Sequence, residues 1–258
     1  MNTIILLSHL GLGDNIFNIP LVNYLSLTNK VEFVCKIQHS KNIKYFIKDN
    51  KNISLFMVES DKDISPKYNC PNDKYNKLTE NKIVMASGSH ITNSNISSFP
   101  FFMYDDVKID RKIFKDYGNY INTQKSLDLY DIIKDYQYIF ISNETSQGKV
   151  FDIDTFLQKK SININETLIV CPNKNIYNLN HPFYKIAENF IYKTNDIMIL
   201  DYKLVIENAE MNILSDSSLF CFAVQLKLKS KNNILFTRNS WDWNRLFDFF
   251  ENSFTIFK

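Results

Sequence analysis

The sequence predicts an α/β protein built on parallel sheets. Short apolar runs of strand length alternate with segments in which apolar residues recur at helical spacing. A first strand is expected over 3–8, followed by a glycine-containing loop, a helix, and further strands over 31–35 and 53–58. This strand–helix–strand order favours parallel strands joined by right-handed crossovers.

The pattern restarts in the second half of the chain. After a polar, irregular segment over 59–81, a strand over 81–86 and one helix over 99–114, strands are expected at 138–141, 167–171, 197–200, 212–214 and 233–236. Helical segments separate them, including an apolar helix over 219–226 and a terminal helix over 241–252. We therefore expect two Rossmann-like domains, residues 1–130 and residues 131–258.

Composition excludes several classes of protein. The chain has 258 residues, of which 45% are hydrophobic, and 30 Lys and Arg against 28 Asp and Glu leave a net charge of +2. A protein that binds nucleic acid through bulk charge would be far more basic. No apolar run approaches the roughly 18 residues of a membrane span, and no signal-peptide pattern opens the chain, so we expect a cytoplasmic protein. The four cysteines lack the paired spacing of a zinc site.

The first candidate site is the loop Gly11-Leu12-Gly13-Asp14 after the opening strand. Glycines let a ligand approach the backbone, and the start of the next helix offers N–H groups to an anion. A dinucleotide fingerprint would need glycine at position 16, which holds Ile16 instead. Asp14 fits two roles, a helix-capping carboxylate or a general base at the rim of a site.

Two further polar loops follow strands. Residues 142–149 supply hydroxyl side chains and end at Lys149, and residues 215–218 read Ser-Asp-Ser-Ser before the apolar helix. Each has a plain structural interpretation, as a solvated loop or an ordinary helix cap. All three loops, however, lie between a strand and a helix, which is where ligands bind in open α/β sheets.

In this order, the three loops resemble those of the lipopolysaccharide heptosyltransferase (ADP-heptose transferase) family of GT-B glycosyltransferases. The resemblance is carried by residues 10–16 with Pro20 and Leu25, by residues 142–149, and by residues 201–223. The chain has Ser142-Asn143 where the family usually has His or Pro-Gly, and Ser218 where a glycine is common. The resemblance implies two Rossmann-like domains whose parallel sheets face each other across a cleft.

The resemblance also implies roles for particular residues. Asp14 would deprotonate the acceptor hydroxyl. Thr145 and Lys149 would hold the diphosphate of the donor, and Asp216, Ser217 and Ser218 would complete the donor site. Gly11 and Gly13 would keep the first loop open to the ligand.

The expected function is that of an inverting, metal-independent glycosyltransferase of hexosyl- or heptosyltransferase type, acting in glycan biosynthesis. Residues 1–130 would bind a glycan or glycolipid acceptor, and residues 131–258 would bind a nucleotide-sugar as co-substrate, with no other cofactor. A catalytically degenerate binding or scaffold protein is the alternative, and a Rossmann oxidoreductase is disfavoured by Ile16. Residues 61–63 and 152–154 both match the Asp-x-Asp motif of metal-dependent glycosyltransferases. The first lies in the polar, irregular segment and the second at an expected helix start, so we assign neither to a metal site. Among the histidines, His9 and His90 lie nearest expected strand ends.

Overall fold

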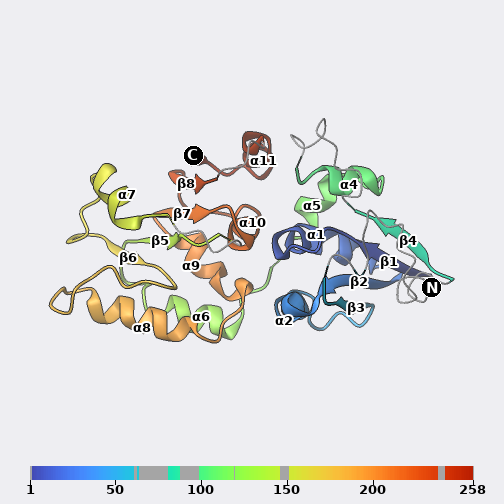
Figure 1. The fold of residues 1–258 in the computed structure, drawn as a ribbon, viewed down its shortest axis with the longest axis horizontal. Helices are drawn as coiled ribbons and strands as arrows, with labels where there is room; N and C mark the ends of the chain where they lie inside the picture. Colours follow the sequence, from blue (N-terminus) through green and yellow to red (C-terminus); the bar gives the residue numbers. More distant parts are fainter. Residues whose placement is uncertain are drawn as a thin grey trace. The chain divides into compact units, whose positions relative to one another are not determined.

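The chain forms two compact α/β units, each with its own parallel sheet, in a computed structural model (Figure 1). The structure describes residues 2–60, 63, 81–87, 99–118, 120–145, 151–237 and 242–257. Unit 1 comprises residues 1–120 and 240–246, and unit 2 comprises residues 121–239 and 247–258. The prediction of an α/β protein with two parallel sheets is confirmed.

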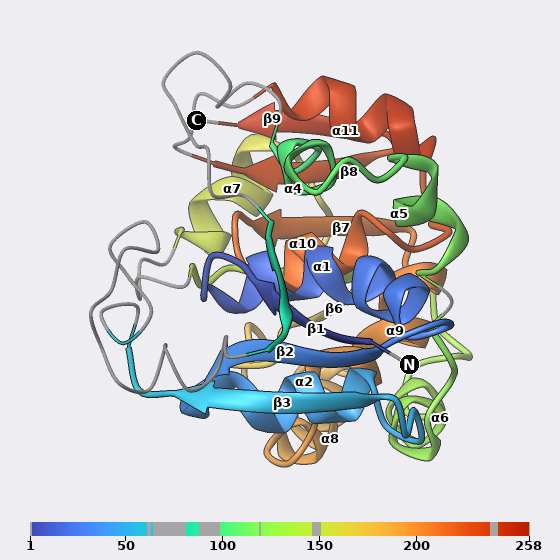
Figure 2. The same ribbon diagram turned by 90° about the vertical axis from the view of Figure 1, so that its right-hand side faces the viewer.

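Unit 1 carries a four-stranded sheet in the order β3-β2-β1-β4, with every neighbouring pair parallel. Figure 2 shows β3, β2 and β1 side by side. The elements of this unit are β1 (Thr3–Leu7), α1 (Leu12–Leu25), β2 (Lys30–Lys36), η1 (Ile37–His39), α2 (Ser40–Phe46), β3 (Ile53–Val58), β4 (Ile83–Ala86), α4 (Phe102–Asp106) and α5 (Lys112–Asp116).

Helix α1 is buried on nearly all sides. It packs on β2 and on α5, and its residues 15–22 are all buried. Burial on nearly all sides explains why the apolar residues of α1 are not confined to one face. The expected single helix over 99–114 is instead two short helices, α4 and α5, separated by a turn in which Lys108 adopts a positive φ of 56°.

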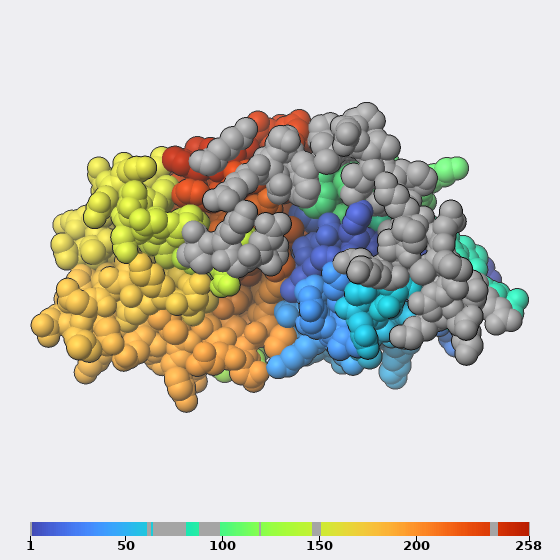
Figure 3. Space-filling model, in the orientation of Figure 1, coloured from blue at the N-terminus to red at the C-terminus, as the bar shows by residue number. Residues whose placement is uncertain are grey.

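Unit 2 carries a five-stranded parallel sheet in the order β6-β5-β7-β8-β9. Its elements are α6 (Gln124–Tyr130), β5 (Tyr138–Ser142), α7 (Ile153–Lys159), β6 (Leu168–Val170), α8 (Tyr184–Thr194), η4 (Ile199–Tyr202), α9 (Lys203–Asn208), β7 (Met211–Ser215), α10 (Ser218–Ala223), β8 (Asn233–Phe236) and β9 (Phe254–Phe257). Helix α11 (Trp243–Phe250) is divided between the units, with residues 243–246 in unit 1 and residues 247–250 in unit 2. In the space-filling view of Figure 3, the segments around α7 and α8, in yellow and orange, are at the visible surface.

The units divide between Tyr120 and Ile121, earlier in the sequence than the boundary expected at residue 130. Helix α6 belongs to unit 2 because it packs against η4, α9 and α8. A buried hydrogen bond fixes this packing: the Thr123 hydroxyl, which caps α6, donates to Asp201 Oδ1 of η4 at 2.5 Å. Tertiary packing, rather than the point where the strand–helix pattern restarts in the sequence, therefore sets the boundary between the two units.

Two elements of unit 2 differ from the sequence prediction. The strand expected over 197–200 is wrong: residues 199–202 form the 3₁₀ helix η4, where Asp201 Oδ2 accepts a hydrogen bond from the Met198 N–H at 2.8 Å. Strand β9 was not expected, and it extends the sheet by pairing with β8. In the part of the chain that the structure describes, no helix has both the length and the apolar character needed to cross a membrane.

Candidate functional site

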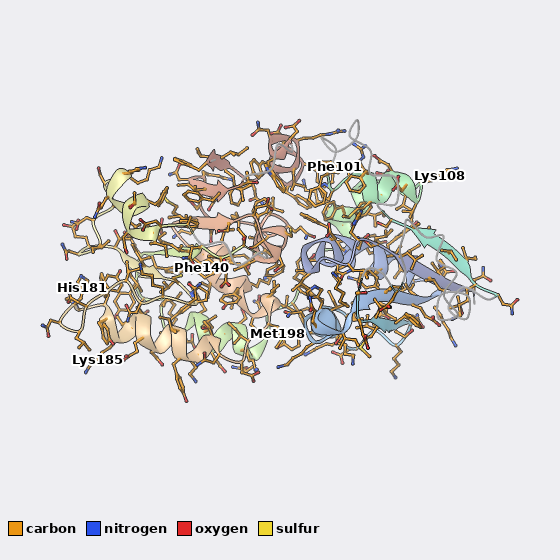
Figure 4. The ribbon with its side chains drawn as sticks, in the orientation of Figure 1. Phe101, Lys108, Phe140, His181, Lys185 and Met198 are labelled. Atoms are coloured by element: carbon orange, nitrogen blue, oxygen red, sulfur yellow. The ribbon has the colours of Figure 1, made fainter. Side chains whose placement is uncertain are left out.

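The connection order of the unit 2 sheet marks a place for a ligand. From β5 the chain goes to β6 on one side, and then crosses to β7 on the other side of β5. At such a reversal the loops leave the sheet in opposite directions and open a crevice beyond the carboxyl ends of the strands. Figure 4 labels Phe140 in the middle of β5, the strand whose carboxyl end leads to this crevice.

A pocket of about 260 Å³ lies at this reversal. We call it the β5 pocket. Its walls come from the loops after β5 and β6, from η4, and from the start of α10. It is lined by Ser142, Asn143, Glu144, Thr145, Pro172, Asn173, Tyr202, Ser217, Ser218 and Leu219.

Hydroxyl groups dominate one part of the β5 pocket, and the one on Ser217 is unusual. Ser217 is the N-cap of α10 in extended conformation, with φ −150° and ψ 176°, yet its side chain makes no capping hydrogen bond. Within the described part of the chain, its buried Oγ has no hydrogen-bond partner. Since a buried polar group without a partner costs about 1–3 kcal/mol, this hydroxyl is suited to an oxygen-rich ligand that would satisfy it.

A thiol ties the loops after β5 and β6 together. The Cys171 Sγ is 2.9 Å from Asn173 Oδ1 and 3.7 Å from Asn143 Oδ1. Burial raises the pKa of the Cys171 thiol, so it remains a protonated donor. With its Oδ1 held by the thiol, Asn173 directs its Nδ2 toward Glu144 Oε2, 3.4 Å away. Asn173 and Glu144, which this contact joins, both line the pocket.

The wall formed by η4 is anchored by a buried carboxylate. Asp201 accepts the hydrogen bonds from Thr123 and the Met198 backbone described above, and it is fully buried. The next residue, Tyr202, lines the pocket. Burial raises the pKa of the Tyr202 phenol, and a hydrogen bond with Thr194 opposes that rise. Figure 4 labels Met198, at the start of this wall.

In unit 1, the Gly11–Asp14 loop follows β1, which also stands at the reversal of its sheet order. Gly11 is the N-cap of α1 and Asp14 lies in its first turn. A Cβ atom placed on Gly11 would be 2.4 Å from Asp14 Oδ2. The carboxylate therefore rests against the glycine, and a side chain at position 11 would displace it. Gly11 rather than Asp14 is the N-cap of α1, so the carboxylate stands in the first turn, where the helix dipole favours a negative charge. Its role as a base stays a prediction.

A buried polar network holds this loop in place. Asn18 of α1 donates from Nδ2 to Ser8 Oγ at 2.8 Å and to the Asp14 carbonyl at 2.9 Å, and its Oδ1 accepts from Ser87 Oγ at 2.6 Å. Asn18 and Ser87 are fully buried and Ser8 is 1% exposed. The network joins the carboxyl ends of β1 and β4 to α1. The sequence did not single out Asn18, because the chain is rich in asparagine.

The structure brings together only part of the residues expected at the site. Thr145, Ser217 and Ser218 line the β5 pocket, together with Asn173 and Tyr202, which sequence reasoning missed. The pocket lining does not include Asp216: its Oδ2 accepts from the Thr237 hydroxyl at 2.9 Å, and its N–H donates to the Phe236 carbonyl at 2.8 Å, both at the end of β8.

The remaining expected residues belong to unit 1 or fall outside the described part of the chain. Gly11, Gly13 and Asp14 belong to unit 1, and Lys149 and His90 lie outside the described residues, as do Asp61 and Lys62. Asp152 caps α7, with its Oδ1 accepting from the Asp154 and Thr155 N–H groups, as its helix-start position predicts. Across the residues that the structure describes, no three His, Cys, Asp or Glu side chains gather as metal ligands would.

Comparison with known proteins finds similarity in structure and none in sequence. No protein-family model matches the chain, and no curated protein matches it in sequence. In structure the chain is similar to the crystal structure of a glycosyl transferase family 9 protein from Veillonella parvula DSM 2008, with a TM-score of 0.51 and 9% identity. The alignment covers 99% of this chain and 85% of that one. The two-unit α/β fold of this chain is therefore one that a glycosyltransferase also has.

Proposed function

We propose that this protein is a glycosyltransferase that binds a nucleotide-sugar in the β5 pocket of unit 2. One observation carries the proposal: a pocket lined by hydroxyl side chains lies at the strand-order reversal of a fold shared with a glycosyl transferase family 9 protein. Such reversals are where nucleotides bind in open α/β sheets. The volume of about 260 Å³ suits part of such a ligand, with the remainder extending beyond the pocket.

The lining chemistry supports a diphosphate as the bound group. Thr145, Ser217 and Ser218 bring hydroxyl donors from two loops, and the unpartnered Ser217 Oγ gains a partner when a phosphate oxygen approaches. Hydrogen bonds to a charged acceptor are about twice as strong as neutral ones. In this proposal Lys149 adds a positive charge from the continuation of the same loop.

We assign the acceptor side to unit 1, with Asp14 as the base. The Asp14 carboxylate takes the proton of the acceptor hydroxyl, whose oxygen attacks the anomeric carbon from the face opposite the donor phosphate. The new C–O bond forms as the bond from the anomeric carbon to the phosphate oxygen breaks, so the configuration inverts. The nucleoside diphosphate leaves with the bonding electron pair, and the hydroxyl and backbone donors of the β5 pocket stabilise its charge without a metal. The acceptor is a glycan or glycolipid hydroxyl, and no further cofactor takes part.

Binding to the β5 pocket is tested by calorimetry of the full chain against a panel of nucleoside diphosphates and their sugars. Ser217→Ala should weaken the best ligand by about tenfold, because one charge-assisted hydrogen bond is lost. In the ligand-free chain it should raise the thermal unfolding temperature, since it removes a buried hydroxyl that has no hydrogen-bond partner. Ser54→Ala, at an exposed serine of β3 in unit 1, is the matched control. A chain that binds none of the panel is not a nucleotide-sugar enzyme.

Catalysis is tested separately with Asp14→Asn. Turnover of the donor–acceptor pair should fall by about 10²- to 10⁴-fold, while donor affinity stays the same. Equal turnover by this variant would remove Asp14 from the mechanism. A wild-type chain that binds nucleotide-sugars but transfers to no acceptor would support the alternative of a degenerate binding protein. Retention of a nicotinamide dinucleotide would instead support an oxidoreductase.

A further inference from the structure

A second pocket, of about 270 Å³, lies at the opposite edge of the unit 2 sheet. We call it the amino-edge pocket, because its walls precede β5, β7 and β8 rather than follow them. It is lined by Tyr130, Lys134, Asp135, Tyr136, Gln137, Tyr138, Asn208, Glu210 and Lys229. Strand β5 joins the two pockets: Ser142 at its carboxyl end lines the β5 pocket, and Tyr138 at its amino end lines this one.

The two pockets are separate sites. Four residue steps of β5 part Tyr138 from Ser142, and at roughly 3.3 Å per residue the two ends are about 13 Å apart. Phe140, the middle residue of β5, lies between these two ends of the strand and is fully buried (Figure 4). A ligand in the amino-edge pocket therefore does not reach the groups that we assign to the donor.

Three tyrosines line the amino-edge pocket, but Tyr138 is only 2% exposed, so Tyr130 and Tyr136 supply its aromatic surface. Tyr138 is fixed, since its buried hydroxyl donates to the Val205 carbonyl at 2.7 Å. Tyr136 is held edge-on against Phe183, with ring centroids 5.9 Å apart, yet 41% of it is exposed. Tyr130 ends α6 beside them. Rigid rings with polar tips offer an apolar face and a hydrogen-bonding edge to the same ligand.

The charged groups of the amino-edge pocket balance one another. Lys229 pairs with Glu210 at 2.5 Å, and Lys134 pairs with Asp131 at 3.0 Å. The lining has two lysines and two acids, Asp135 and Glu210, so it favours neither an anion nor a cation. Together with the amides of Gln137 and Asn208, these groups form a dense set of donors and acceptors.

We propose that the amino-edge pocket binds one or two rings of a neutral carbohydrate. The flat C–H face of a sugar ring matches the exposed ring of Tyr136, and its hydroxyls, which both donate and accept, match a lining that is polar and neutral in sum. The volume is just below that of pockets for drug-sized ligands, which suits a mono- or disaccharide. This site is non-catalytic, and it holds a sugar at a distance from the proposed donor pocket.

The experiment is saturation-transfer NMR with calorimetry on the full chain, using the neutral disaccharides lactose, maltose and chitobiose as probes. At least one should bind, and Tyr136→Ala should weaken it about fivefold to tenfold, while Tyr136→Phe, which keeps the ring, should retain the binding. Tyr192→Ala is the matched control, because Tyr192 on α8 is 72% exposed and is not part of the pocket lining.

Three results decide the matter. Binding that is lost in Tyr136→Ala and kept in Tyr192→Ala supports the proposal. Failure of all three probes to bind overturns it, as does binding that Tyr136→Ala leaves unchanged. The result does not depend on the proposed transferase activity, because disaccharide binding is measured without a nucleotide and should persist in Ser217→Ala.

Discussion

Replacing Asn18 by leucine should destabilise unit 1, because the network around the Gly11–Asp14 loop depends on one amide. Leucine has a similar size but no polar atoms, so the change removes hydrogen bonds without leaving a large cavity. The Ser8 hydroxyl and the Asp14 carbonyl each lose a donor at 2.8–2.9 Å. Ser87 keeps a second acceptor, the Met103 carbonyl at 3.0 Å. The Asp14 carbonyl keeps its place in the backbone ladder of α1, so Ser8 is the buried group left without its donor, and we expect a loss of about 1–3 kcal/mol.

The assay is equilibrium unfolding in urea, followed by circular dichroism and fluorescence so that separate transitions of the two units are detected. Asn189→Leu, at an exposed asparagine of α8, is the control and should change the free energy of unfolding by less than about 0.5 kcal/mol. Ser87→Ala should lose less stability in the Asn18→Leu background than in the wild type, since the two side chains share a hydrogen bond. A loss below about 1 kcal/mol for Asn18→Leu, or strict additivity, would refute the network.

Three further predictions concern single positions. Alanine fits the backbone at position 11, where φ is −63° and ψ is 144°, but its Cβ would displace the Asp14 carboxylate. The turnover of Gly11→Ala should therefore fall about tenfold to a hundredfold. Gly118→Ala is the control and should match the wild type, because an added Cβ there has no contact nearer than 3.4 Å. Burial raises the pKa of the Cys35 thiol from 9.0 to about 11. As the pH rises, the thiol ionises at a lower pH in the unfolded chain than in the folded one. The free energy of unfolding, measured in urea, should therefore decline between pH 9 and pH 11, and less steeply in Cys35→Ala. Cys171→Ala should weaken nucleotide binding about threefold to tenfold in calorimetry, and Cys171→Ser, which keeps a donor, should weaken it less.

Much of the architecture is visible in the sequence because it depends on neighbours along the chain. The apolar run before Gly11 is long enough for a buried strand, and the helical spacing after it defines α1. Local patterns failed where a distant partner decides the conformation. Residues 199–202 have the apolar character of a strand end, but Asp201 binds Thr123, 78 residues away, and the segment becomes η4.

The candidate site shows the same division. Thr145 and Ser217 could be singled out because polar residues after a strand are a local signal. Asn173 and Tyr202 could not, because neither stands in a recognisable motif, and they reach the β5 pocket only when β6 and β7 pair on opposite sides of β5. Asp216 belongs to the same short motif as Ser217, yet its side chain turns to Thr237 at the end of the neighbouring strand.

The sequence by itself determined that strands and helices alternate in two parallel α/β units and that a glycine-containing loop follows the first strand, because these follow from residue spacing. Only the tertiary structure decided which loops share a pocket, where unit 1 ends, and that a second pocket opens at the amino edge of the unit 2 sheet. The physical reason is that strand order is set by long-range pairing and packing, whose energies are summed over residues far apart in the chain and leave no periodic trace in any short window of sequence.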